Sequence, residues 1–146
     1  MRDYIELLTS TMKIDPDDYS PLTSRNRRLS FAYAVAGWLY MLRRQKNTRI
    51  QMVASIMVML LALALQVDAV RLALLVIVIT IVWMAEFLNA AVEAAVNLAT
   101  TELHPMAKVG KDVAAAAVLL GVVASIIVGV LVLGPPLLFR LGLPGP

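Results

Sequence analysis

Three long apolar segments constrain this chain more than any other feature of its sequence. They cover residues 50–66, 72–99 and 113–133 of the 146. A helix of about 20 apolar residues crosses the roughly 30 Å hydrocarbon core of a bilayer. The pattern therefore predicts three transmembrane helices, of which 72–99 reaches about 42 Å and extends beyond the core at one end. A polar connection at 66–71 and a loop at 100–112 separate the three helices.

The composition excludes several classes of protein. Apolar residues make up 60% of the chain and charged residues 16%, against roughly 45–50% and 25% in soluble domains. The length predicts one domain. With no cysteine and a single histidine, the chain cannot form a disulfide scaffold, a thiolate metal site or a cage of several histidines. The net charge of +3 fits a membrane surface, and so apolar a chain is not expected to bind nucleic acid.

An apolar segment before the first span is too short to cross a membrane. Residues 29–42 lie between two arginine pairs, and a helix of this length reaches only about 21 Å. Basic flanks and aromatic residues such as Trp38 are typical of a helix that lies on the membrane surface, here at about 27–45. A buried helix of a soluble domain is the alternative. We expect a polar cytoplasmic extension at 1–24 and a membrane domain at 25–146.

Basic residues predict the orientation of the chain in the membrane. Most of them precede the first span or lie in the loop between the second and third spans, whereas the opposite side carries only Arg71 and Arg140. Basic residues concentrate on the cytoplasmic side of membrane proteins. The pattern therefore predicts a multi-pass protein of the inner (plasma) membrane whose N-terminus and 100–112 loop are cytoplasmic.

Two acids in the second span require an explanation, because a charge inside a membrane is costly. Glu86 and Glu93 are seven residues apart, so they share nearly one helix face, which Asn89 and Asn97 extend into a polar stripe. Glu86 lies about 21 Å into the helix, and Glu93 lies roughly 10 Å nearer the cytoplasm. This arrangement suits chemistry that joins a lipid headgroup to a water-soluble, anionic substrate. The alternatives are hydrogen bonding between helices and a path for protons or cations.

The third span carries small residues at every fourth position. These residues are Ala117, Gly121, Ser125 and Gly129. Small residues at this spacing let two helices approach closely in lipid. We therefore predict that this stripe packs closely against another helix, within one chain or between chains.

An ordered set of polar residues resembles the signature of a known family. The set comprises Glu-x-x-Asn-x-x-x-Glu from Glu86 to Glu93, then Asn97, His104 and Lys111-Asp112 before a run of alanines. This pattern is similar to the prokaryotic diacylglycerol kinase and undecaprenol kinase family over about residues 25–135. The resemblance implies an all-α integral membrane protein, with an interfacial helix and three spans, that assembles as a homotrimer with shared sites.

The resemblance also implies an activity and a set of site residues. It indicates an ATP-dependent kinase that phosphorylates a membrane lipid alcohol, either undecaprenol or diacylglycerol, with Mg²⁺ as cofactor. Glu86 corresponds to the base that acts on the lipid hydroxyl, and Glu93 corresponds to an acid that binds the metal. The implied nucleotide-binding residues are Tyr33, Glu93, Glu102, Leu103, His104, Lys111 and Asp112, and the implied lipid-binding residues are Glu86, Asn89 and Ala115.

Two positions depart from the family pattern. Gln45 stands where the family has a second metal-binding glutamate, and Asn97 stands where an aspartate is usual. An amide oxygen can bind magnesium but brings no negative charge. Weaker metal binding, one metal ion fewer and an inactive relative are all consistent with these changes. A non-catalytic lipid-binding membrane protein on the same scaffold and a small ion or proton channel therefore stay open as alternatives.

Overall fold

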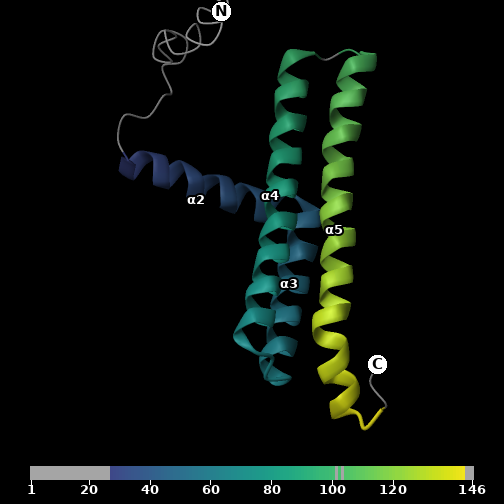
Figure 1. The fold of residues 1–146 in the computed structure, drawn as a ribbon. Helices are drawn as coiled ribbons and strands as arrows, with labels where there is room; N and C mark the ends of the chain where they lie inside the picture. The colour runs from purple at the N-terminus through teal and green to yellow at the C-terminus, as the bar shows by residue number, and fades with distance from the viewer. Residues whose placement is uncertain (1–26, 101, 103, 144–146) are drawn as a thin grey trace, which may run out of the picture. The chain divides into compact units, whose positions relative to one another are not determined.

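The computed structural model describes residues 27–100, 102 and 104–143 (Figure 1). The regular secondary structure of these residues is entirely helical, in the order α2 (Arg27–Arg44), α3 (Lys46–Ala64), α4 (Ala69–Ala99) and α5 (Pro105–Arg140). The all-α class predicted from the sequence is confirmed. The extension expected at 1–24 and the predicted site residue Leu103 lie outside the described residues.

Helix α2 has nearly the bounds expected for the surface helix. It runs from Arg27 to Arg44, against the predicted 27–45, and its last turn contains Arg43 and Arg44. Gln45 follows in an extended conformation (φ −95°, ψ 118°). The helical path is therefore interrupted at Gln45, and α3 begins as a separate helix.

Helices α3, α4 and α5 are each long and apolar enough to cross a membrane. They confirm the three predicted spans, although each begins earlier than expected, and α5 begins at Pro105 rather than at 113. Pro105 stands at the first helical position, where its missing N–H costs no hydrogen bond. His104 caps the same helix, because its Nδ1 accepts the Met106 N–H at 3.2 Å. Most of the loop expected at 100–112 is consequently the first part of α5.

Helix α5 also continues past the point where the sequence predicts its end. The Gly134-Pro135-Pro136 motif predicts a stop after residue 133, but the helix runs through both prolines to Arg140, so that prediction is wrong. Each proline lacks an N–H and leaves one carbonyl of the preceding turn without its helical donor. Membrane helices tolerate such positions because local adjustments and neighbouring groups satisfy the freed carbonyls. Beyond the helix, Gly142 has a positive φ of 69°, which a residue without a side chain adopts readily.

Helices α4 and α5 form the closest pair in the unit made by residues 41–146, and they run side by side and antiparallel (Figure 1). Gly121 of α5 is buried against α4, since a Cβ atom there would lie 3.6 Å from Cγ2 and 3.7 Å from Cα of Val82. Helix α3 joins the pair in a small apolar cluster of Ala62, Leu75, Val132 and Leu133. The predicted close packing is therefore confirmed at Gly121, whereas a Cβ at Gly129 would meet nothing within 4 Å.

Replacement of Gly121 by leucine is expected to destabilise the protein by about 1–3 kcal/mol, because the added atoms overfill the contact with α4. Leu120 is adjacent and 71% exposed, so Leu120→Phe adds bulk outside that contact and should change stability by less than about 0.5 kcal/mol. Thermal unfolding of both variants in detergent measures the difference. Equal thermal midpoints would show that the contact between α4 and α5 does not require a small residue at position 121.

Asp68 caps the start of α4 at the tight turn that follows α3. Its Oδ1 accepts the Arg71 backbone N–H at 3.0 Å, and its Oδ2 lies 3.3 Å from Arg71 Nε. The backbone hydrogen bond from Arg71, assisted by the Arg71 charge, lowers the pKa of the Asp68 carboxyl below its ordinary value. Such a carboxyl stabilises the folded state above its unfolded pKa of about 3.9, and this effect is lost as the pH falls through the lower folded value.

We therefore expect Asp68→Ala to lower the thermal midpoint at neutral pH, and the difference from wild type to shrink as the pH falls below about 4. Asp68→Asn keeps a side-chain oxygen that can cap the helix and should lose less at neutral pH. Thermal unfolding in detergent across this pH range checks both variants. A constant difference between wild type and Asp68→Ala at every pH would contradict a role for the ionised carboxylate.

Candidate functional site

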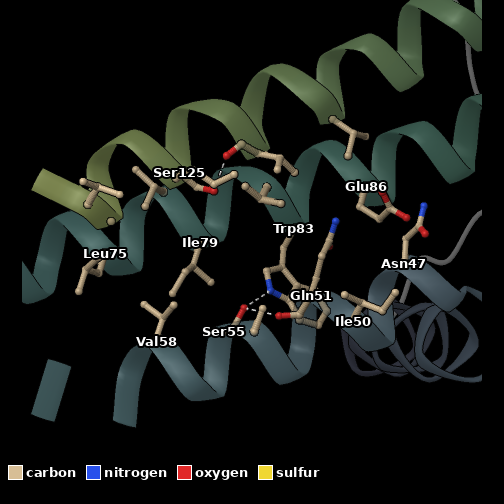
Figure 2. A pocket seen from close by; sticks show the side chains of 18 of the residues that line it. Asn47, Ile50, Gln51, Ser55, Val58, Leu75, Ile79, Trp83, Glu86 and Ser125 are labelled. Carbon is tan, nitrogen blue, oxygen red and sulfur yellow. Dashed lines mark hydrogen bonds between the residues drawn. The ribbon is translucent and has the colours of Figure 1, made fainter. Parts of the chain in front are cut away.

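Glu86 is the one buried charged side chain among the described residues, with 3% of its surface exposed. It lies in the middle of α4, and the amide side chains of Asn47 and Gln51 on α3 line the same groove beside its carboxylate. Figure 2 shows Asn47 directed toward Glu86 from the neighbouring helix. Two amides four residues apart share one face of α3, so the sequence did contain a signal for this contact, but Asn47 and Gln51 were not predicted as site residues.

An apolar groove of about 620 Å³ extends from Glu86 along α3, α4 and α5 (Figure 2). Its walls beyond the glutamate are mainly aliphatic side chains, such as Val58, Leu75, Ile79 and Leu133. The indole of Trp83 lies in the wall, and its Nε1 donates to Ser55 Oγ at 3.1 Å. A carboxylate at one end and hydrocarbon along the rest give the groove the polarity of a lipid with one small polar group.

Glu93 lies two helical turns beyond Glu86 on α4, about 10 Å along the helix axis. Its Oε1 accepts a hydrogen bond of 3.2 Å from Asn89 Nδ2. The other polar atom of this amide, Asn89 Oδ1, is buried and has no hydrogen-bond partner within the described part of the chain. Three members of the predicted polar stripe therefore lie in order along α4.

A second cavity, of about 870 Å³, lies at the junction of α4 and α5. Its lining includes four residues predicted to bind a nucleotide, namely Glu102, His104, Lys111 and Asp112. Asn97, the last member of the polar stripe, also lines it. The cavity forms because the short connection after α4 turns the chain back and places the first two turns of α5 beside the last turn of α4.

The charged groups of this second cavity are held by local contacts. Lys111 Nζ donates to Asn97 Oδ1 across the two helices at 2.7 Å, while Lys108 forms an ion pair with Asp112 within α5. Asn97 is a neutral acceptor, so it orients Lys111 without cancelling its charge. The Nδ1 atom of His104 accepts the Met106 N–H, and the neutral imidazole then carries its hydrogen on Nε2. The cavity thus offers an oriented ammonium group and an imidazole N–H to an anion.

Several predicted site residues are not brought into either cavity. Tyr33 lies on the part of α2 that falls outside the compact unit of residues 41–146. The predicted residues that lie in the same unit as both cavities but line neither of them are Gln45, Asn89, Glu93 and Ala115. Within the described residues, no group of three or more His, Asp or Glu side chains is placed to hold a metal ion.

These features define a multi-pass helical membrane protein with a buried acid at one end of an apolar groove and a second, charged cavity beyond it. The sequence pattern of prokaryotic diacylglycerol kinase matches residues 32–133. The chain therefore belongs to the prokaryotic diacylglycerol kinase family.

Two relatives support this membership. A diacylglycerol kinase of Synechocystis is 40% identical over 114 residues, which are 77% of this chain and 65% of the relative. An undecaprenol kinase of Bacillus subtilis is 32% identical over 108 residues, which are 74% of this chain and 88% of the relative. The matched region is thus slightly less than two thirds of the Synechocystis protein. Both relatives are named kinases, which does not favour a channel or a non-catalytic lipid-binding protein.

Proposed function

We propose that this chain transfers the γ-phosphoryl group of ATP to the hydroxyl of a membrane lipid alcohol at the cytoplasmic membrane surface. The observation that carries the proposal is the position of Glu86, a buried acid at the end of an apolar groove. Glu93 follows on the same helix, and the cavity with Lys111 follows beyond it. This order lets a lipid hydroxyl reach Glu86 from the groove and lets the phosphates of a nucleotide approach from the second cavity.

In this reaction the lipid hydroxyl gives its proton to the Glu86 carboxylate as its oxygen forms a bond to the γ-phosphorus. The bond between that phosphorus and the β–γ bridging oxygen breaks, and ADP leaves with the electron pair. The resulting lipid phosphate is anionic, and Glu86 later releases its proton. Positioning and neutralisation of phosphate charge carry most of the catalysis in phosphoryl transfer, and Asn47 and Gln51, which line the groove with Glu86, are placed to orient its carboxylate.

The residues that neutralise the phosphates are proposed to be those of the second cavity. Lys111 supplies a positive charge, and His104 supplies its Nε2–H. We assign Glu102 and Asp112, which line the cavity, to the same nucleotide site. Tyr33 and Leu103 are assigned to it on the strength of the family resemblance alone. Asn89 and Ala115 are assigned to the lipid end of the site on the same basis.

The residues present fit a magnesium ion that enters with the nucleotide. Mg²⁺ in kinase sites is usually held by one or two carboxylates together with substrate phosphates. Glu93 offers one such carboxylate, whereas Gln45 and Asn97 offer only amide oxygens. The oxygen of Asn97 already accepts a hydrogen bond from Lys111 Nζ. We propose that Glu93 holds the ion, which would offset the negative charge of the phosphates.

The proposed assembly is a homotrimer in the inner membrane, with the N-terminus on the cytoplasmic side. Sites shared between subunits would give Tyr33, Gln45 and Ala115, which line neither cavity of one chain, a role beside a neighbouring copy. The clustering of basic residues before α3 and in the first turns of α5 supports the orientation. Chemical crosslinking in detergent would test the trimer.

The activity is tested with purified protein in detergent micelles, labelled ATP and a panel of lipid alcohols that includes undecaprenol and a diacylglycerol. We expect label to appear in the organic phase only when a lipid alcohol is present. Folded protein that binds ATP but transfers no label to any of these lipids would overturn the proposed function. ATP hydrolysis without a phosphorylated lipid would have the same consequence.

A further inference from the structure

We propose that the groove of α3, α4 and α5 holds the hydrocarbon chain of the substrate as one extended prenyl-type chain, and that Gly129 determines how far this chain reaches. The inference rests on the proposed lipid kinase activity and adds a residue that sets chain-length specificity. The occupant of the groove is then the hydrocarbon chain of the substrate and not a helix from a second copy of the protein.

The dimensions of the groove suit a chain that begins at Glu86. Leu75 lines the groove eleven residues before Glu86 on the same helix, which corresponds to about 16 Å of helix axis. Val58 of α3 and Leu133 of α5 lie at the same end as Leu75, as the apolar cluster shows. A lipid hydroxyl at Glu86 would therefore direct its chain along the groove toward this cluster.

The hydrogen bonds in the groove favour a chain without ester groups. Beyond Gln51 the wall contains three polar side chains, and each donates its hydrogen within the protein. Trp83 Nε1 donates to Ser55 Oγ at 3.1 Å, and Ser55 Oγ donates to the backbone carbonyl of Gln51 at 2.7 Å. Ser125 Oγ donates to the backbone carbonyl of Val122 at 2.8 Å. A hydroxyl and an indole have one hydrogen each, so these groups leave none for an ester carbonyl, whose burial without a donor is costly. A prenyl chain has no such carbonyl.

The polar end of the groove explains why a lipid alcohol is the better occupant. Gln51 lines the groove, and its Oε1 atom is buried without a hydrogen-bond partner in the described structure. Rotation about the broad terminal torsion of glutamine turns this oxygen toward the groove, where it can accept a hydrogen bond from the lipid hydroxyl as the lipid enters, before that hydroxyl donates its one hydrogen to Glu86. The backbone amides of a helix from a second copy are already bonded within that helix, so such a helix would need a polar side chain at this point to donate to Gln51.

Gly129 leaves the far part of the groove open. It lines the groove from α5, and a Cβ atom at this position would meet nothing within 4 Å. Ser125 and Leu133, one helical turn to either side, also line the groove, so a larger side chain at 129 would enter the same space. Gly134 is equally open at its Cβ but is not part of the groove wall, which makes it a matched control on the same helix.

The kinetic test compares wild type, Gly129→Phe and Gly134→Phe with three alcohols: geraniol, which is too short to reach position 129, undecaprenol and dioleoylglycerol. We expect Gly129→Phe to raise KM for undecaprenol about 10-fold or more, because it removes apolar contact space. For the same variant, the KM for geraniol and the kcat values for geraniol and undecaprenol should stay within about 2-fold of wild type. Gly134→Phe should match wild type in all of these values. Gly129→Leu should give an intermediate value and serves if the phenylalanine variant does not fold.

The results separate the inference from the function on which it rests. Equal effects of Gly129→Phe on geraniol and undecaprenol would overturn the role of Gly129 in chain length. An increase in KM for dioleoylglycerol without one for undecaprenol would overturn the assignment to a prenyl chain. If wild type phosphorylates none of the three alcohols, the proposed function itself fails.

Occupancy of the groove can be measured without catalysis. The chain has two tryptophans, Trp38 and Trp83, so Trp38→Phe leaves the indole in the groove wall as the only one. A brominated long-chain prenol, added without ATP, should quench this fluorescence saturably, and unlabelled undecaprenol should compete. The quenching should weaken when Gly129→Phe is added. Fluorescence that does not respond to the brominated prenol would place the chain outside the groove and overturn the inference.

Discussion

Glu86→Gln should lower kcat for a lipid alcohol by about 100-fold or more, in line with the contribution of a general base. The change keeps the size of the side chain and removes its ability to take a proton. Glu86 lies at the head of the groove with the amides of Asn47 and Gln51, which can hydrogen-bond to a carboxylate or to another amide, so an amide at position 86 can still occupy the same place. Glu86 does not line the second cavity, so Glu86→Gln should retain nucleotide binding.

The measurement pairs lipid phosphorylation in micelles with binding of a fluorescent ATP analogue. Asp68→Asn is a matched control, since it makes the same change of carboxylate to amide at the N-terminal end of α4, outside both cavities. We expect its kcat to stay within about 2-fold of wild type, as for surface changes in general. Turnover near the wild-type level in Glu86→Gln would remove this residue from the chemistry, and loss of nucleotide binding in the same variant would show a wider structural effect.

The spans were predictable because each depends on a local run of apolar residues long enough to cross a bilayer. Their ends were less predictable. Pro105 begins a helix and Pro135 lies inside one, because the first position of a helix requires no N–H and a helix in lipid gains little by leaving its hydrogen-bonded form. The same residue type therefore has opposite meanings at the two ends of α5, and only its surroundings decide between them.

The candidate site divides in a similar way. Glu102, His104 and Lys111 lie within ten residues of one another, so one turn of the chain brings them to the same cavity. The contact of Gln51 with Glu86 joins two helices separated by a long stretch of sequence. It depends on how α3 rotates against α4, which the pattern of either helix alone does not specify. The groove has walls from three helices and could not be read from any one of them.

Lys111→Met should lower kcat/KM for ATP by about 100-fold, comparable to the loss of one preorganised donor in other phosphoryl and acyl transfer sites. Two lysines line the second cavity, but their surroundings differ. The charge of Lys108 is offset by its ion pair with Asp112, whereas Lys111 donates to the neutral oxygen of Asn97 at 2.7 Å. The ammonium group of Lys111 is therefore oriented and forms no ion pair within the described residues, which favours the attraction of phosphate oxygens.

The variant that separates charge from orientation is Asn97→Ala. It removes the acceptor that orients Lys111 and keeps the ammonium group, so we expect kcat/KM for ATP to fall only several-fold, roughly the effect of one hydrogen bond. Because Asn97 and Lys111 act through one contact, the double variant should lose little more than Lys111→Met alone. Steady-state kinetics over a range of ATP concentrations at a fixed lipid fraction measure all three. If Lys111→Met loses no more than Asn97→Ala, the charge of Lys111 does not act on the nucleotide, and the anion must be held by other groups of the cavity.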